Sequence, residues 1–212
     1  MELNQAIKSY SSQPLTHQLL MSLLKDYKRP NDKVHTLLDS GILESIKKGL
    51  YIAGPALTSK RPEPFLLANH IFGPSYISSD SALSYYGLIP ERVYETSSMT
   101  SKPSRSYKTS MGRFTYTKIP LPYYSFGLTQ EGLSESEFVM MASPEKALFD
   151  KVVTTRGLVL RSQVNVISYL IDDLRIDEDS LKDLDTDYMS VWLPDSPKKD
   201  SLSMLVKTIK RL

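Results

Sequence analysis

The residues best suited to metal chemistry are Glu145, Lys146 and Asp150, where two carboxylates flank a lysine. Metal-dependent nucleases hold a hydrated Mg²⁺ between carboxylates and place a lysine beside the attacking water. Here all three residues fall in one expected helix, as a charged first turn followed by core residues. Because charge runs on helices are usually solvated, we interpret them as structural and predict no catalytic residue.

The sequence contains few residues suited to other classes of catalytic or cofactor site. The chain has no cysteine, which removes thiolate zinc sites and cysteine nucleophiles and is typical of a reducing compartment. Its three histidines make a histidine-rich metal site improbable. Neither glycine-rich phosphate-binding motif occurs. The acidic run at 172–179 lacks the glycine and ligand spacing of a calcium loop. We therefore expect a protein that is not an enzyme and holds neither metal nor cofactor.

Basic and polar residues near position 30 are candidates for binding DNA. In a helix-turn-helix, the N-terminal side chains of the second helix meet base edges and phosphates. The residues expected there are Lys28, Arg29, Asn31, Lys33, His35 and Thr36. Lys47 and Lys48 are expected at a hairpin tip, where they would pair with a flanking phosphate or the minor groove. Asp32 and Asp39 would repel phosphate if they turned outward. Docking of a protein by the same kind of domain remains an alternative.

The elements expected around these residues follow the order of a winged helix-turn-helix. Leucines and Tyr27 line one face of a helix at 15–27, with Pro14 and Thr16 at its start. Asn31 is the expected N-cap of a second helix that ends at Gly41. Gly49 then supplies the positive φ of a hairpin turn. A short helix at 2–9 would complete the three-helix core.

A stretch rich in proline and small polar residues at 55–64 predicts a domain boundary. We expect a winged-helix DNA-binding domain over 1–58 and a partner-binding domain over 65–212. In the second domain, helices are predicted at 65–72, within 76–87 from the cap Ser78 or Ser79 to Gly87, and from the cap Ser143. Alternating residues over 93–119 predict strands. The rear is expected to be helical, at about 161–172, about 178–184 and 200–212. The fold class is therefore α+β, with a small sheet and a helical C-terminal part.

A second basic stretch lies on the expected strands of the second domain. Its members are Lys102, Arg105, Lys108, Arg113 and Lys118. These side chains would extend the DNA footprint. Alternatively, they form the ordinary polar outer face of a strand pair.

The charges are distributed unevenly along the chain, although the net charge is only +2. Residues 1–118 hold 15 Lys and Arg against 9 Asp and Glu, whereas residues 119–200 hold 8 against 15. A basic N-terminal part and an acidic C-terminal part, called the acidic rear below, suggest two different partners. No apolar run has the length of a signal peptide or a membrane span, so we expect a cytoplasmic protein without a membrane partner.

Several segments together resemble the AbiEi antitoxins of type IV toxin–antitoxin (abortive infection) systems. They are GILESIKKGLYIAGP, LLANHIFGPSYISSDSALSYYGLIPERVYETSSMT, TSMGRFTY and MASPEKALFD, and the resemblance covers roughly residues 15–155. It implies a winged helix that represses its own operon and an antitoxin domain that counteracts a nucleotidyltransferase toxin, AbiEii. The chain is short for that family, and its rear beyond about residue 160 carries no motif that aligns.

The resemblance also implies a positively charged face that spans both domains and binds operator repeats cooperatively, with self-association on DNA. The residues it designates are Lys28, Arg29, Lys33, Lys47, Lys48, Arg105, Lys108 and Arg113. The expected function is that of an antitoxin and DNA-binding autorepressor in phage defence. Two alternatives remain: a winged-helix regulator without a toxin partner, and a cryptic nuclease that uses Glu145 and Asp150.

Overall fold

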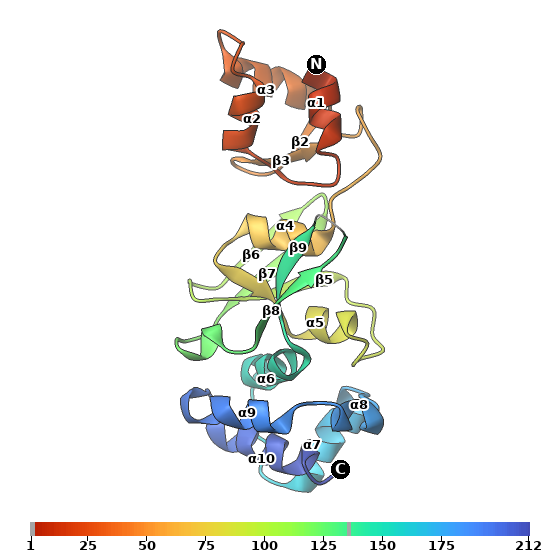
Figure 1. Ribbon diagram of the computed structural model, residues 1–212, viewed down its shortest axis with the longest axis vertical. Helices are drawn as coiled ribbons and strands as arrows, with labels where there is room; N and C mark the ends of the chain where they lie inside the picture. The colour runs from red at the N-terminus through yellow and green to blue at the C-terminus, as the bar shows by residue number, and fades with distance from the viewer. Residues whose placement is uncertain (1–2, 135–136) are drawn as a thin grey trace. The chain divides into compact units, whose positions relative to one another are not determined.

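A computed structural model describes residues 3–134 and 137–212 of the chain. The chain divides into two compact units (Figure 1). The first unit comprises residues 1–73 together with Lys108–Gly112, and the second comprises Pro74–Tyr107 and Arg113–Leu212. In the described residues, no helix has the length and apolar character needed to cross a bilayer.

The first unit contains a helical part and a three-stranded antiparallel sheet. Its elements are α1 (Leu3–Ser9), β1 (Leu15–Thr16), α2 (His17–Leu23), α3 (Pro30–Asp39), β2 (Leu43–Lys47), β3 (Leu50–Ala53) and α4 (Pro64–Ile71). The strands lie in the order β1-β3-β2. Gly49 has a φ of +81° in the turn between β2 and β3, which confirms the predicted hairpin.

An apolar core joins α1, α2 and α3 of this unit to its sheet. The buried members are Ile7, Leu15, Leu20, Leu24, Val34, Leu37, Leu43 and Ala53. Leu15, Leu20 and Leu24 come from the leucine face predicted for a helix at 15–27, but Leu15 lies in β1 and the helix begins only at His17. Thr16 caps α2 by accepting a hydrogen bond from the Leu19 amide at 3.2 Å. Burial of these side chains fixes the N-terminus of α3 relative to the hairpin within the unit.

Three local predictions for this unit differ from the structure. Tyr27 is 41% exposed rather than turned into the core, because α2 already ends at Leu23. Asn31 is not the N-cap of α3, since Pro30 occupies the first turn and Arg29 is the capping residue, without a side-chain hydrogen bond. The segment from 59 to 73, including α4, groups with the first unit instead of forming a linker and the start of the second.

The second unit is built on a mixed six-stranded sheet with the order β6-β7-β5-β4-β9-β8. Its strands are β4 (Ser75–Ile77), β5 (Glu95–Thr100), β6 (Arg105–Thr109), β7 (Gly112–Lys118), β8 (Leu128–Gly132) and β9 (Phe138–Ala142). β4 and β9 run parallel, as do β5 and β7, whereas β4–β5 and β8–β9 are antiparallel. The predicted alternation over 93–119 is confirmed as β5 to β7. The sheet is larger than predicted because β4, β8 and β9 were not expected.

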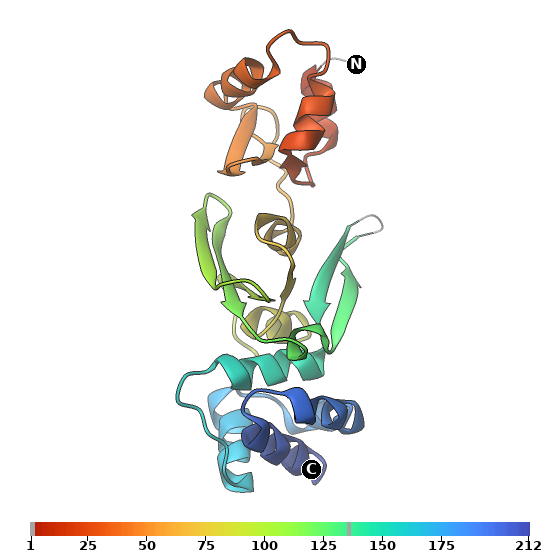
Figure 2. The same ribbon diagram turned by 90° about the vertical axis from the view of Figure 1, so that its left-hand side faces the viewer.

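Helices complete the second unit (Figures 1 and 2). They are α5 (Asp80–Tyr85), α6 (Pro144–Thr154), α7 (Gln163–Ile167), a π-helical segment (Ser168–Asp173), α8 (Glu178–Lys182), α9 (Thr186–Trp192) and α10 (Lys199–Ile209). α6 lies between the sheet and the C-terminal helices in both views, and it contacts β9, α9 and α10. Ser143 caps α6 and Pro144 occupies its first turn, as predicted.

Candidate nucleic-acid interface

The N-terminal end of α3 presents most of the polar residues that the sequence designates for DNA. Those whose side chains are exposed are Lys28, Arg29, Asn31, His35 and Thr36, while Lys33 is half-buried. Val34 and Leu37 are buried in the core and anchor the helix from the opposite face. The structure therefore brings these six residues together at the start of α3 and in the two residues that precede the helix.

Two local contacts partly engage the cations of this group. The guanidinium of Arg29 lies 3.3 Å from the Asp32 carboxylate, with the two side chains 84% and 66% exposed. Ion pairs at such exposure contribute little, so Arg29 can exchange this partner for a phosphate at small cost. The ammonium of Lys33 lies 5.5 Å from the centre of the Tyr27 ring. Asp39 is exposed at the far end of α3, away from this cationic end.

The two lysines of the β2–β3 hairpin have different surroundings. Lys48 is exposed in the turn itself. Lys47 is half-buried, and its ammonium donates a hydrogen bond to the main-chain carbonyl of Ile71 at the end of α4. The register of the hairpin shifts between Ser45 and Lys47, as in a β-bulge. The expectation that both lysines serve the tip therefore fits Lys48 and not Lys47.

The second basic stretch lies on β6 and β7. Arg105 and Lys108 are exposed on β6, which forms one edge of the six-stranded sheet. Arg113 is exposed on β7, 3.0 Å from the Glu95 carboxylate. Lys108 belongs to the segment that groups with the first unit, whereas Arg105 and Arg113 belong to the second. Lys102 is exposed before β6 begins, and Lys118 is exposed at the end of β7.

A buried ionic network in α6 is a feature that the sequence reading missed. Lys146 and Asp150 are both 0% exposed, and their charged groups are 2.9 Å apart. Asp150 accepts hydrogen bonds from the Tyr76 hydroxyl at 2.9 Å and from the Ser78 hydroxyl at 2.7 Å. The prediction of a solvated charged turn is thus wrong for these two residues. Because Lys146 and Asp150 are four residues apart, the sequence predicts that they share one face of the helix. It does not indicate that β4 covers this face.

The ammonium of Lys146 is held by the segment before β8 as well as by Asp150. It donates to the Tyr123 carbonyl at 3.0 Å and lies 3.1 Å from the centre of the Tyr123 ring. Burial lowers the pKa of Lys146, and the attraction of Asp150 opposes that shift. Glu145 accepts from the Ser143 hydroxyl and from the Asp185 amide. The three residues considered for nuclease chemistry are therefore each engaged in packing and capping contacts.

Among the described residues, no group of three or more His, Asp or Glu side chains is arranged to hold a metal ion.

Comparison with known proteins finds a similarity of fold but none of sequence family. No family model matches the chain, and no curated protein matches it. A crystal structure of the RV2827C protein from Mycobacterium tuberculosis is similar, with a TM-score of 0.65 and 14% sequence identity over 98% of this chain and 75% of that one. This likeness shows the fold alone.

The acidic rear predicted from the sequence maps onto the C-terminal helices of the second unit. Its exposed carboxylates are Asp172, Asp173, Asp177, Glu178, Asp179, Asp183, Asp185 and Asp187. Asp177 and Asp185 are N-caps of α8 and α9, where each accepts amide hydrogen bonds of its helix. Glu178 and Asp187 form exposed ion pairs with Lys182 and Lys210. Part of this acidity therefore has a local structural role.

Proposed function

We propose that the protein is a DNA-binding autorepressor and the antitoxin of a type IV toxin–antitoxin operon, counteracting a nucleotidyltransferase toxin. The single observation that carries the DNA-binding part is the group of exposed polar and basic side chains at the start of α3. The N-terminus of a helix carries a partial positive charge of its own, which acts together with these side chains in favouring a phosphate.

In this proposal the first unit acts as a winged helix-turn-helix. α2 and α3 are the helical pair, with α3 in the major groove, and the β2–β3 hairpin is the wing. Lys28, Arg29, Asn31 and His35 then meet phosphates and base edges, and Lys48 meets a flanking phosphate. Arg105, Lys108 and Arg113 would contribute further phosphate contacts. The pairing of Arg113 with Glu95 argues that its contribution is the smaller.

The antitoxin part of the proposal rests on the resemblance of residues 15–155 to AbiEi antitoxins and on the acidic C-terminal helices. Exposed carboxylates that are not needed as caps or ion-pair partners are available to a basic surface. Asp172 and Asp183 meet that condition, since neither side chain forms a hydrogen bond or an ion pair with another described residue. The burial of Lys146 and Asp150 favours a protein without nuclease activity over a cryptic nuclease.

Operator binding is tested by gel shift with a fragment of the protein's own promoter across a series of salt concentrations. Each phosphate contact contributes about 0.9 to the slope of log K against log salt. Replacing Lys28 and Arg29 with alanine should therefore reduce the slope by about 1.8. Lys8→Ala removes an exposed lysine from α1 and should leave the slope unchanged. Wild-type protein that fails to bind the fragment at low salt would refute the proposal.

Antitoxin activity is tested by co-expression with the nucleotidyltransferase encoded beside the gene. Wild-type protein should restore growth, and the double charge reversal Asp172→Lys, Asp183→Lys should weaken that rescue while leaving DNA binding intact. The N-caps Asp177 and Asp185 are left unchanged in this variant, because their loss would lower the stability of the helices. A wild-type protein that gives no rescue, or the absence of a neighbouring nucleotidyltransferase gene, favours a regulator without a toxin partner.

A further inference from the structure

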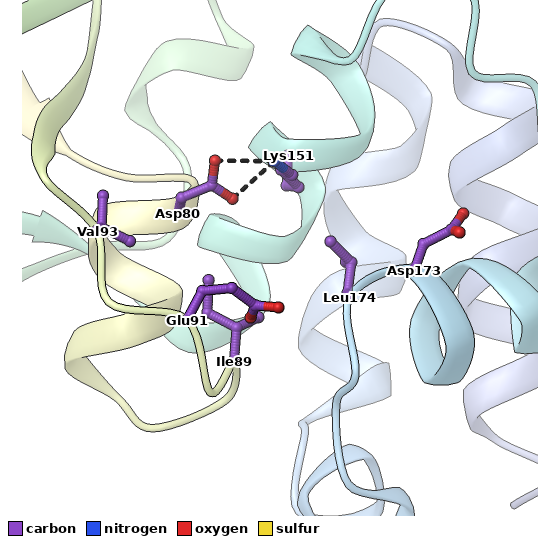
Figure 3. Close-up of a pocket in the computed structure, with 7 residues that line it drawn as sticks. All are labelled: Asp80, Ile89, Glu91, Val93, Lys151, Asp173 and Leu174. Atoms are coloured by element: carbon purple, nitrogen blue, oxygen red, sulfur yellow. Dashed lines mark hydrogen bonds and ion pairs between the residues drawn. The ribbon is translucent and has the colours of Figure 1, made fainter.

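A cavity of about 350 Å³ opens in the second unit, between the loop that follows α5 and the end of the π-helical segment (Figure 3). Its volume falls within the range of about 300–1,000 Å³ that is typical of small-molecule sites. Asp80, Glu91 and Asp173 contribute carboxylates to its wall, and Lys151 contributes an ammonium. All of these residues belong to the second unit. None of them takes part in the proposed DNA interface.

The carboxylates of Asp80 and Glu91 in this wall are already paired with cations, one from the wall itself and one from outside it. The Lys151 ammonium lies 2.7 Å from one carboxylate oxygen of Asp80 and 2.8 Å from the other. The guanidinium of Arg175 binds Oε1 of Glu91, which lowers the pKa of that carboxyl. Asp173, on the opposite wall in Figure 3, makes neither an ion pair nor a hydrogen bond to any described residue. The wall therefore carries one uncompensated negative charge.

Two further polar atoms near the cavity lack partners. Oε2 of Glu91 is buried and accepts no hydrogen bond from the described residues. The Tyr169 side chain is 94% buried, and its hydroxyl makes no well-formed hydrogen bond within the same residues, although the Thr155 hydroxyl lies near it. Burial raises the pKa of Tyr169, and the charges of Asp80 and Asp173 raise it further. Buried polar atoms are normally hydrogen-bonded, so Oε2 of Glu91, a residue of the cavity wall, is suited to a bound polar group.

The remaining lining is apolar and comes from two segments. Ile89 and Val93 belong to the loop after α5, and Leu174 follows the π-helical segment. A π-helix is a rare element that is often found at functional sites. Here it ends at Asp173, directly before Leu174, so one turn supplies both the free carboxylate and an apolar contact. Such a lining fits a ligand with a cationic end and a short aliphatic arm.

We propose that this cavity binds a primary ammonium group carried on a short aliphatic chain. Asp173 is the counter-ion of the ammonium, Oε2 of Glu91 accepts one of its hydrogen bonds, and the aliphatic arm packs on Ile89, Val93 and Leu174. A free amine and the lysine side chain of a bound peptide share this chemistry.

The test uses the full chain, with the methyl groups of Ile89, Val93 and Leu174 observed by NMR. Pentylamine should shift these methyl signals and saturate in the millimolar range, which is ordinary for a ligand of about six heavy atoms. Pentanoate carries the same arm with the opposite charge and should leave the signals in place. Asp173→Asn should weaken pentylamine binding about tenfold, the loss of about 1.4 kcal/mol expected for one ion pair.

The matched control is Asp183→Asn, which removes an exposed carboxylate of the same acidic region outside the cavity. It should bind pentylamine as the wild type does. The proposal is overturned if the amine leaves the three methyl signals unmoved, if pentanoate binds equally well, or if both variants weaken binding alike. Comparing 1,5-diaminopentane with an end-blocked tripeptide centred on lysine then identifies the source of the ammonium, because the natural one should bind more tightly.

Discussion

The ammonium of Lys146 and the carboxylate of Asp150 lie 2.9 Å apart on successive turns of α6, and both side chains are withdrawn from solvent. Asp150 also joins α6 to β4 through the hydroxyls of Tyr76 and Ser78. Lys146 joins the same helix to the segment before β8. The pair thus connects three parts of the second unit that are distant in sequence.

Removal of one member of this pair should strongly destabilise the second unit. Asp150→Ala leaves a buried ammonium without its counter-ion and two hydroxyls without their acceptor, so we expect a loss of about 3–5 kcal/mol. Trp192 is the chain's one tryptophan, and its ring centre lies 5.6 Å from that of Phe149, so its fluorescence during urea unfolding reports on this unit.

The exposed residue Asp172 provides the control for that experiment, because Asp172→Ala should change stability by no more than about 0.5 kcal/mol. The double variant Lys146→Met, Asp150→Asn removes both charges and should regain part of the loss. A cost below about 1 kcal/mol for Asp150→Ala would contradict the structural role given to the pair.

Gly127 should tolerate no side chain. Its φ is +58°, and an added Cβ would lie 2.7 Å from both the Lys146 Cβ and a ring carbon of Trp192. Gly127→Ala should therefore cost about 2–4 kcal/mol in urea unfolding, from overpacking as well as backbone strain. Gly157 has a φ of +70° with open space around it, so Gly157→Ala isolates the strain and should cost about 1 kcal/mol. Equal losses at the two positions would show that packing at Gly127 is not tight.

The stability of the second unit should fall at alkaline pH through Tyr123. Burial, and then the negative charge of Asp150, raise the pKa of Tyr123 well above its usual value. The unfolded chain then loses this proton first, so the contribution is complete below about pH 10 and is lost as the pH rises above it, by about 1.4 kcal/mol per pH unit.

Tyr123→Phe checks this pH dependence. Its effect at neutral pH should be small, because the Tyr123 hydroxyl makes no well-formed hydrogen bond among the described residues. Urea unfolding is measured at about pH 9.5 and about pH 11, which lie on either side of the ordinary tyrosine pKa of about 10. The free energy of unfolding should fall less between these two pH values in the variant than in the wild type. Parallel pH profiles for the two proteins would mean that Tyr123 does not titrate with unfolding.

Replacing each of the two hairpin lysines should have a different effect, on DNA binding for Lys48 and on stability for Lys47. Lys48→Ala should reduce the salt slope of operator binding by about 0.9, because an exposed ammonium in the turn is free to meet a phosphate. Lys47→Ala should leave that slope nearly unchanged and instead lower the thermal stability of the first unit, since the Lys47 ammonium bonds the Ile71 carbonyl. The opposite pattern would move the proposed wing contact to Lys47.

Local signals in the sequence predicted the elements that depend on neighbouring residues. The turn at Gly49 and the cap at Ser143 are of this kind, and both are confirmed. The leucine face is confirmed in part, because Leu20 and Leu24 are buried as expected but Leu15 lies in β1. The predicted start of α3 is two residues too late, because Pro30 takes the first helical position and Arg29, not Asn31, is the N-cap. The fold class was accessible because these signals concern contacts only a few residues apart.

Features that depend on distant segments could not be predicted in this way. β4 is buried along its whole length, so it shows no alternation, and β9 was obscured by the helix start that follows it. The burial of Lys146 and Asp150 depends on Tyr76 and Ser78, some 70 residues earlier in the chain. The cavity was missed for the same reason, since its walls come from the loop after α5, α6 and the π-helical segment.

The parallel pairing of β4 with β9 affects how the chain folds during synthesis. Ile77 meets Met141 across that pair, so the centre of the larger sheet stays open until the ribosome has added the residues of β9. The first unit's sheet, by contrast, is complete once Ala53 has emerged. The growing polypeptide therefore completes its first sheet early, while one edge of β4, already paired with β5 on the other side, lacks its neighbour for more than sixty further residues.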